Sequence, residues 1–155
     1  MLRAAHGVRP SLLLCALIAA VSSASAPQSP DYTARVTASY EKVRSAALAV
    51  LSARGWQIQE SKKQAGLIST DWSSVQGKYY LGCGKLSNAS VVEDEQARLT
   101  VHLKKRGKRV EVTVRAQYRQ SRRTGTSTRW VDCTSRGQME RAVNDEIIAA
   151  SGGTF

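Results

Sequence analysis

Several features that particular functions require are scarce or missing in this chain of 155 residues. The longest apolar run, Leu12 to Val21, has about ten residues, whereas a helix needs about 20 to cross a bilayer, so no transmembrane segment is predicted. The chain has only 2 histidines and 3 cysteines, which is few for the clustered ligands of most metal sites. The stretch Gly82-Cys83-Gly84 lacks the Lys-Ser/Thr of a phosphate-binding loop. The sequence therefore predicts no metal and no cofactor.

The first 26 residues have the order of a secretory signal peptide. Arg3 and Arg9 precede the apolar run, and small residues ending in Ala24-Ser25-Ala26 follow it. We expect cleavage after Ala26, with Ala24 as the alternative. Leu14 is too bulky for the position before a lipid-modified cysteine, so we interpret Cys15 as an ordinary residue of the removed segment. A membrane anchor is the alternative interpretation of these residues.

Cleavage would leave residues 27–155, a length that suits one domain with one core. The net charge of the whole chain is +11, of which Arg3 and Arg9 contribute two charges. Two cysteines remain, Cys83 and Cys133, and an even number of cysteines in an exported chain predicts a disulfide. The alternative is a metal-binding or nucleophilic pair.

No catalytic residue is predicted. His102 is the only histidine after residue 26, and it lies on the polar side of a predicted strand, where a solvated histidine is common. A cysteine nucleophile would need this histidine as its base. Glu93, Asp94 and Glu95 are consecutive, which is typical of a solvated loop rather than of paired catalytic carboxylates. We therefore interpret the protein as non-enzymatic.

One helix is predicted over residues 39–55, because apolar side chains recur there at steps of three and four residues. Ser39 is a suitable N-cap, and Glu41 lies in the first turn, where the helix dipole favours a negative charge. Gly55 suits the left-handed position after the last turn. The alternating residues Tyr32 to Val36 predict a strand before this helix. The apolar stripe of the helix consists of Tyr40, Val43, Ala47, Val50 and Leu51.

The stretch from Gly55 to Trp72 predicts two short strands joined by a polar connection at 61–66. Such a short connection favours antiparallel pairing. Residues 73–95 have no clear period and predict a long loop tethered by Cys83. Alternation places one set of side chains from the two strands on the same face, toward the core of the domain: Trp56, Ile58, Ile68, Thr70 and Trp72.

A hairpin is predicted from strands at 97–104 and 109–118, with Arg106-Gly107 in the turn. Alternate residues of both strands are apolar, so one face should be buried and the other solvated. A polar loop at 121–125 and a strand near 126–133 follow.

The final helix is predicted to start at Thr134-Ser135, because Ser135 and Gln138 have capping-box spacing, and to end at Gly152-Gly153. The whole predicts a single α+β domain over residues 27–155, an antiparallel sheet with two helices packed on one face. The stripe of the last helix is Met139, Val143, Ile147 and Ala150. The expected core consists of Val43, Val50, Leu51, Ile58, Ile68, Leu99, Val101, Val112, Val114, Val143 and Ile147.

Two motifs carry a family resemblance. The first, V-x-x-A-x-x-A-L-x-x-x-G-W-x-I, is present as Val43, Ala46, Ala49, Val50, Leu51, Gly55, Trp56 and Ile58, and the second, G-x-I-x-T-x-W, as Gly66, Ile68, Thr70 and Trp72. Basic alternating strands and a cysteine just before a last helix follow. Over most of residues 32–150 the chain resembles the BamC-like (NlpB-type) lipoprotein domains of bacterial envelopes.

This resemblance implies a helix-grip or TBP-like arrangement of the sheet and helices. It also implies a place in the periplasm or at the outer-membrane periphery, and an accessory or structural role that binds an envelope protein, as in outer-membrane assembly. BamC-like proteins are lipid-anchored, and Cys15 does not fit that modification.

Positive charge is the feature that most suggests binding. Five cations lie between Lys104 and Arg109, and such a cluster attracts polyanions. The expected partners are an envelope protein, anionic lipid or a lipopolysaccharide surface. Nucleic acid is not expected, because Tyr118 and Trp130 are few aromatics for stacking bases. The proposed binding residues are Lys104, Lys105, Arg106, Lys108, Arg109 and Arg115.

Alternatives to this binding role remain open from the sequence. The cations can belong to a solvated sheet edge, where lysine opposes edge-to-edge aggregation. A small apolar-ligand or lipid carrier would need a cavity between the sheet and the last helix. A secreted polyanion-binding protein would use the basic hairpin Lys104–Arg109. Trp56, Trp72 and Trp130 either pack in the core or line an aromatic ligand site.

Overall fold

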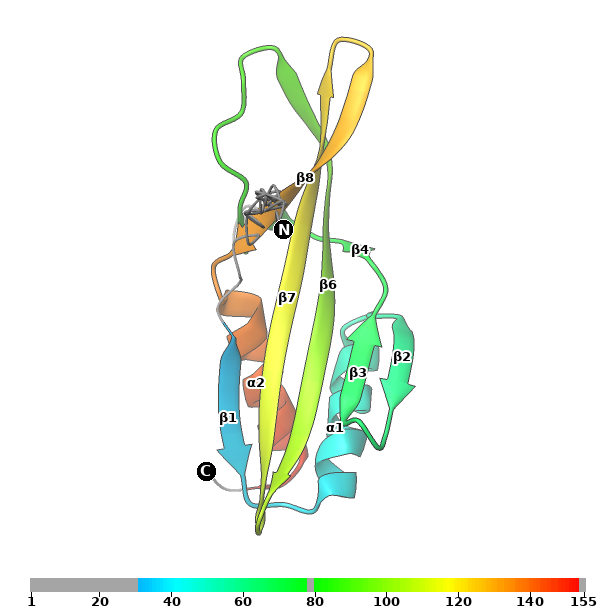
Figure 1. The fold of residues 1–155 in the computed structure, drawn as a ribbon, viewed down its shortest axis with the longest axis vertical. Coiled ribbons are helices and arrows are strands. Elements are labelled where there is room, and N and C mark those ends of the chain that lie inside the picture. The colour runs from blue at the N-terminus through cyan, green and yellow to red at the C-terminus, as the bar shows by residue number, and fades with distance from the viewer. Residues whose placement is uncertain (1–30, 78–79, 154–155) are drawn as a thin grey trace, which may run out of the picture.

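The computed structural model describes residues 31–77 and 80–153. The predicted signal peptide, including Cys15 and the cleavage site at Ala26, lies outside these residues. Figure 1 shows the elements, whose bounds in chain order are β1 (Tyr32–Val36), α1 (Tyr40–Ala53), β2 (Ile58–Lys62), β3 (Leu67–Thr70), β4 (Ser73–Ser74), β5 (Leu81–Gly82), β6 (Ser90–Arg106), β7 (Arg109–Thr124), β8 (Ser127–Ser135) and α2 (Gln138–Ala150).

The centre of the fold is the long antiparallel hairpin of β6 and β7, whose strands have 17 and 16 residues. Strand pairing runs in the order β2-β3-β6-β7-β8-β5, with β1 beside β7 and β4 beside β6. Strands β1 and β8 therefore lie end to end along one edge of β7, while β3 and β4 do so along β6 (Figure 1). The β7–β8 turn and the start of β6 extend past both helices as a three-stranded arm.

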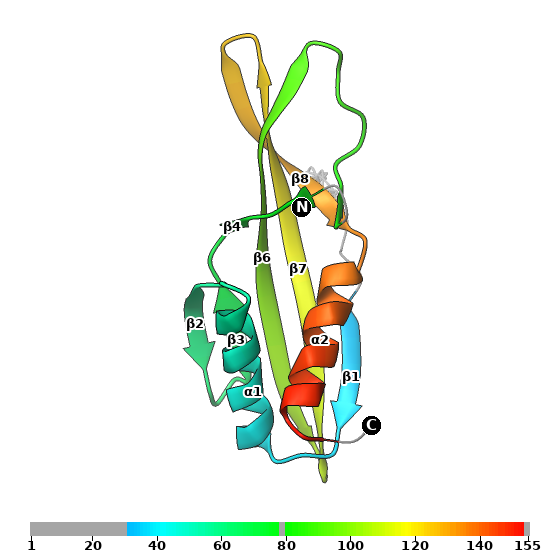
Figure 2. The ribbon, with the colours of Figure 1, turned by 180° about the vertical axis from the view of Figure 1, so that it is seen from behind.

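Both helices cover the same face of this sheet, as Figure 2 shows, so the predicted α+β class with two helices on one face is confirmed. The helices also contact each other, and a bidentate ion pair joins them: Arg54 Nε and Nη2 donate to Glu146 Oε2 and Oε1 at 2.8 and 2.6 Å. The helix-covered face is the inner face of the sheet, and the opposite, solvated face is its outer face.

Helix α1 begins and ends as the sequence predicts. The Ser39 side chain accepts a hydrogen bond from the Lys42 backbone N–H, which satisfies one free donor of the first turn. At the other end Gly55 has φ +79°, and the N–H groups of Gly55 and Trp56 donate to the carbonyls of Ser52 and Leu51. This Schellman arrangement turns the chain back and places Trp56 under the helix.

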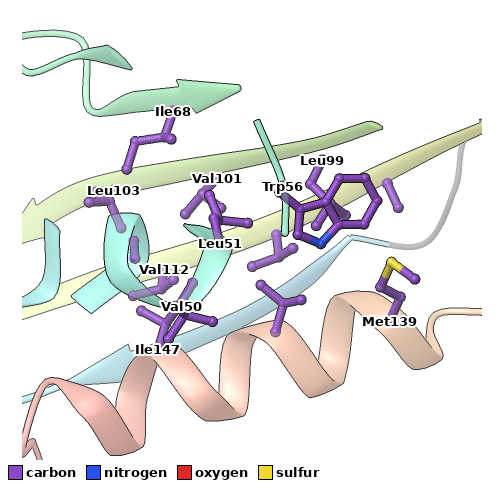
Figure 3. Packing of buried hydrophobic residues seen from close by; sticks show 14 of the residues in the cluster. Val50, Leu51, Trp56, Ile68, Leu99, Val101, Leu103, Val112, Met139 and Ile147 are labelled. Atoms are coloured by element: carbon purple, nitrogen blue, oxygen red, sulfur yellow. The ribbon is translucent and has the colours of Figure 1, made fainter. Parts of the chain in front are cut away.

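The core lies between the inner face and the two helices (Figure 3). Side chains of α1 and α2, among them Leu51 and Ile147, point toward Val101 and Val112 of the central hairpin. The predicted core residues are all buried except Ile58, which is partly buried and packs against the cluster. Prediction from alternation succeeded here because one face of β6 and β7 excludes water along the length of the helices.

The two predicted loops at 73–95 and 121–125 are wrong in extent. β4 and β5 lie within the first, β6 already begins at Ser90, and β7 continues to Thr124. Alternation fails in this arm because the helices do not cover it. Polar cross-strand pairs hold it instead, for example Glu93 Oε1 with Arg123 Nε at 2.5 Å. Ser90 and Thr124 also share a hydroxyl hydrogen bond of 2.6 Å.

The prediction that Trp72 faces the core is wrong because of a bulge before β4. Ser69 pairs with Thr100 and Ser73 pairs with Ala97, so three residues of this strand oppose only two of β6. The Thr70 hydroxyl accepts the N–H of Leu99 at 2.9 Å, which replaces the lost ladder bond. The extra residue turns Trp72 to the outer face.

The start of the last helix also differs from the prediction. β8 continues through Ser135, the N-cap is Gly137 with φ +77°, and no side chain caps the helix, so the predicted capping box is absent. The Ser135 hydroxyl instead accepts from the Gly137 N–H at 2.9 Å. Met139, Val143 and Ile147 are buried as expected, whereas Ala150 is exposed.

Candidate functional site

The basic end of the sheet, residues Lys104–Arg109, is the turn that joins β6 to β7. Arg106 pairs with Arg109, and Gly107 has φ +62°, a left-handed conformation that suits glycine in so tight a turn. All six residues are exposed. The fold therefore brings the five predicted cations of this stretch together on a protruding turn, at the opposite end of the hairpin from the arm (Figure 1).

Only part of this positive charge is balanced. Glu111 accepts from Arg35 Nε at 3.1 Å and lies 3.5 Å from Arg106 Nη2. The hydrogen bond from Arg35 lowers the pKa of Glu111, so this carboxylate remains ionised. Within the described residues, Lys104, Lys108 and Arg109 form no ion pair within 4.0 Å. The basic end thus keeps an excess of positive charge that faces solvent.

A hollow of about 980 Å³ adjoins the basic end. It forms where β3 stops, since the last pair of β3 with β6 is Leu67 with His102, while β6 continues to Arg106. The hollow borders this end of β6 and reaches the first turn of α1. Its charged and aromatic lining consists of Tyr40, Glu41, Lys63, His102, Lys104, Lys105, Glu111 and Arg115.

Two lining side chains are already held in place by contacts within the chain. The Tyr40 hydroxyl donates to the Lys63 carbonyl at 2.8 Å, and Lys105 Nζ lies 5.4 Å from the centre of the Tyr40 ring. This contact fixes one cation at the mouth of the hollow.

Arg115 lies farther along the sheet than the other predicted binding residues. It pairs with Thr100 whereas Lys104 pairs with Glu111, a separation of four residues or about 13 Å. Its Nη2 donates to Asp31 Oδ2 at 2.5 Å, so its charge is balanced by a neighbour. Arg115 borders the hollow but does not belong to the basic end.

The outer face carries a second group, which sequence analysis missed. The tryptophan–arginine ladder consists of Arg98, Trp72, Arg119 and Trp130. The guanidinium carbon of Arg119 lies 4.1 Å from the Trp72 ring centre and 4.3 Å from that of Trp130, and Arg98 lies 4.9 Å from Trp72. Each arginine thus lies over an aromatic face, which is favourable for a cation.

The three tryptophans lie on two different faces of the sheet. Trp56 is 8% exposed and belongs to the core, whereas Trp72 and Trp130 flank Arg119 on the opposite side of the sheet. The three therefore do not line one ligand site. Only the bulge before β4 brings Trp72 to the ladder, and nothing in the alternation of the sequence signals this.

The predicted disulfide between Cys83 and Cys133 is present, with the two Cα atoms 4.3 Å apart. It joins the segment after β5 to β8, next to the two residue pairs of β5 with β8. Both sulfurs are bonded, so neither is available as a thiol nucleophile for His102. His102 itself is exposed on the outer face.

A buried arginine supports the segment that carries Cys83. Arg122, 8% exposed, donates to the carbonyls of Cys83 and Lys85 and to Gln120 Oε1. Gln120 in turn donates to Glu95, whose other oxygen accepts from the Gly77 N–H at 2.8 Å. This chain of hydrogen bonds, together with the disulfide, holds Gly77 and residues 80–85 against the arm.

A second buried polar group lies under α2. Glu140 is 0% exposed, and neither of its carboxyl oxygens nor the Tyr118 hydroxyl has a hydrogen-bond partner among the described residues. Burial raises the pKa of Glu140 and of Tyr118, and an interaction with Ser135 offsets this only in part. The burial of Glu140 could have been predicted from the sequence, because Glu140 follows Met139 on the buried side of the helix.

Comparison with protein-family models and with curated proteins gives no match for this chain. None of the helices in the described residues is both long enough and apolar enough to cross a membrane.

Proposed function

We propose that this chain is an exported, non-enzymatic protein of a bacterial cell envelope that holds an acidic partner protein at its basic end. In this proposal the fold is the helix-grip arrangement of the BamC-like resemblance, and the role is accessory or structural, as in outer-membrane assembly. Localisation in the periplasm or at the outer-membrane periphery follows from the predicted signal peptide.

The observation that carries the proposal is the unbalanced charge of the basic end. Its cations protrude on one turn, and Lys104, Lys108 and Arg109 form no ion pair with described residues. A cluster of this kind steers an oppositely charged surface and speeds association. The turn is held by the register of the hairpin and by the Lys105–Tyr40 contact, so binding would cost little ordering of the backbone.

The test is an affinity pull-down from the native envelope, with captured proteins identified by mass spectrometry. The variant Lys105→Gln/Arg106→Gln/Lys108→Gln should lose the partner that the wild type captures. A matched control, Lys42→Gln/Lys85→Gln/Arg129→Gln, removes the same charge from exposed positions elsewhere and should retain it. Equal capture of the partner by both triple variants would show that the basic end does not bind it.

A second candidate is binding of anionic lipid or lipopolysaccharide, and the hollow favours it. A headgroup phosphate in the hollow would meet Lys104 beside His102 on the outer face of β6, or Lys105 on the other face of the strand, next to Tyr40. Vesicles containing about one third phosphatidylglycerol should then bind the wild type, with affinity falling steeply as salt rises. Vesicles of phosphatidylcholine alone serve as the control. Capture of a protein with no affinity for anionic vesicles would favour the first candidate.

An apolar carrier receives no support from the described residues. Buried side chains of α2, β6 and β7 pack against one another between the sheet and the last helix (Figure 3). The hollow adjoining the basic end is lined largely by charged and polar groups.

A further inference from the structure

Trp130 ends the tryptophan–arginine ladder with a large exposed surface. Its side chain is 44% exposed, although one ring face lies over Arg119. Trp72, at the other side of Arg119, is half-buried and has a guanidinium group near its ring from both Arg98 and Arg119. The stacking of Arg119 fixes the orientation of the Trp130 ring while its remaining surface faces solvent. The exposed part of the Trp130 ring can therefore stack against a ligand.

Polar groups that can form hydrogen bonds surround this ring. Asp132 lies two residues along β8 on the same face, about 7 Å away, and it pairs in register with Arg119. Among the described residues, the Asp132 carboxylate and the Trp130 indole N–H have no hydrogen-bond partner. Arg119 uses Nε and Nη2 to bond Gln96 Oε1, at 3.0 and 2.6 Å, which leaves its Nη1 available.

Carboxylates as well as arginines lie near Trp130, which limits the class of ligand. Arg119 and Arg123 lie on the same face as Glu93 and Asp132, and Glu93 binds both Arg123 and the Thr128 hydroxyl. A nucleotide or another polyanion would meet these carboxylates beside the ring. A cation would meet two arginines. A neutral ligand with an apolar face and hydroxyl groups fits both features.

We propose that Trp130, Asp132 and Arg119 form a binding site for a neutral sugar ring. The apolar C–H face of the sugar stacks on the open surface of Trp130. The Asp132 carboxylate accepts hydrogen bonds from sugar hydroxyls, and Arg119 Nη1 and the indole N–H donate to sugar oxygens. The sugar site lies on the arm, whereas the proposed function uses the opposite end of the hairpin. The two proposals are therefore tested independently.

The test uses neutral tetrasaccharides: chitotetraose, cellotetraose, maltotetraose and mannotetraose. Each is titrated to about 10 mM against the disulfide-bonded protein by calorimetry, a range that detects even a millimolar Kd. Tryptophan fluorescence of the Trp72→Phe variant follows the same titration, with Trp130 as its one exposed tryptophan. At least one sugar should bind, and raising the salt to about 0.5 M should leave its affinity unchanged because no ion pair forms.

Three variants locate the binding. Trp130→Ala should weaken it about tenfold or more, and Trp130→Phe should recover part of the loss because it keeps a ring. Asp132→Asn should weaken binding while leaving the ring in place. Val91→Ala is the matched control, since Val91 is 55% exposed on the same arm and should bind sugar as the wild type does.

Three results would overturn the inference. The first is that no sugar of the panel binds, and the second is that Trp130→Ala binds sugar as tightly as the wild type. The third is that the protein binds only anionic polymers and loses this binding with the triple change at Lys105, Arg106 and Lys108. The last result would support the basic end while removing the sugar site. A protein partner that docks on Trp130 would be revealed by pull-down loss in Trp130→Ala without any sugar affinity.

Discussion

Removing the Cys83–Cys133 bridge should destabilise this domain strongly. The bridge joins residues 50 apart in sequence, so in the chain-entropy model it restricts the unfolded chain by about 4 kcal/mol. Unfolding a domain of about 130 residues changes the entropy by about 0.27 kcal/mol/K, so the melting temperature should fall by about 15 °C.

The assay is thermal unfolding of residues 27–155, followed by circular dichroism. Cys83→Ala/Cys133→Ala should melt about 15 °C below the oxidised wild type. Wild type in reductant should approach the variant, and reductant should leave the variant unchanged. Identical melting of the wild type with and without reductant would refute the reasoning, because the bridge would then contribute nothing.

Two further predictions concern buried positions. Because burial raises the pKa of Glu140 in the folded state, the contribution of this group to stability should be greatest below its unfolded pKa of about 4.3 and should be lost as the pH rises through its folded pKa. In urea unfolding between pH 4 and 8, Glu140→Gln should show a weaker dependence of the free energy of unfolding on pH, and a higher free energy of unfolding than the wild type at neutral pH. A pH profile identical to that of the wild type would contradict this prediction. Gly66→Ala should cost about 2 kcal/mol or more in urea unfolding, because Gly66 has φ +66° and a Cβ there would collide with the Leu103 carbonyl. Gly107→Ala is the control, with a similar φ of +62° and no atom within 4 Å of the added Cβ, and should cost only about 1 kcal/mol; equal losses would show that the collision is relieved.

The parts of the fold under the helices could be predicted from the sequence. In the hairpin, alternation from Ala97 to Tyr118 identifies the buried face because water is excluded from one side only. The cap at Ser39 and the glycine at Gly55 mark α1 because each meets a local backbone requirement that no distant contact alters. The pairing of Cys83 with Cys133 follows from simple counting.

The arm and the outer face could not be predicted in the same way. Residues 90–95 pair through charges and hydroxyls rather than through buried side chains, so their sequence resembles a loop. The position of Trp72 depends on one extra residue before β4, which alternation cannot reveal. Ser135 has capping-box spacing with Gln138, but β8 holds it in extended conformation and it bonds Gly137 instead.

The two candidate sites differ in the same way in how far the sequence predicts them. The cluster Lys104–Arg109 is contiguous, so the turn that presents it follows directly from the hairpin prediction. Arg119 and Trp130 come together only through the register of β7 with β8, and Trp72 only through the bulge. Composition indicates the first group, whereas only tertiary pairing assembles the second.

The most direct test of the account is photo-crosslinking in the native envelope from a photoreactive residue placed at Lys108. Thr126, in the turn at the opposite end of the hairpin, is the control position. The account predicts that one acidic protein crosslinks from position 108 and not from position 126. Crosslinking of that protein from position 126 alone, or equally from both ends, would contradict it.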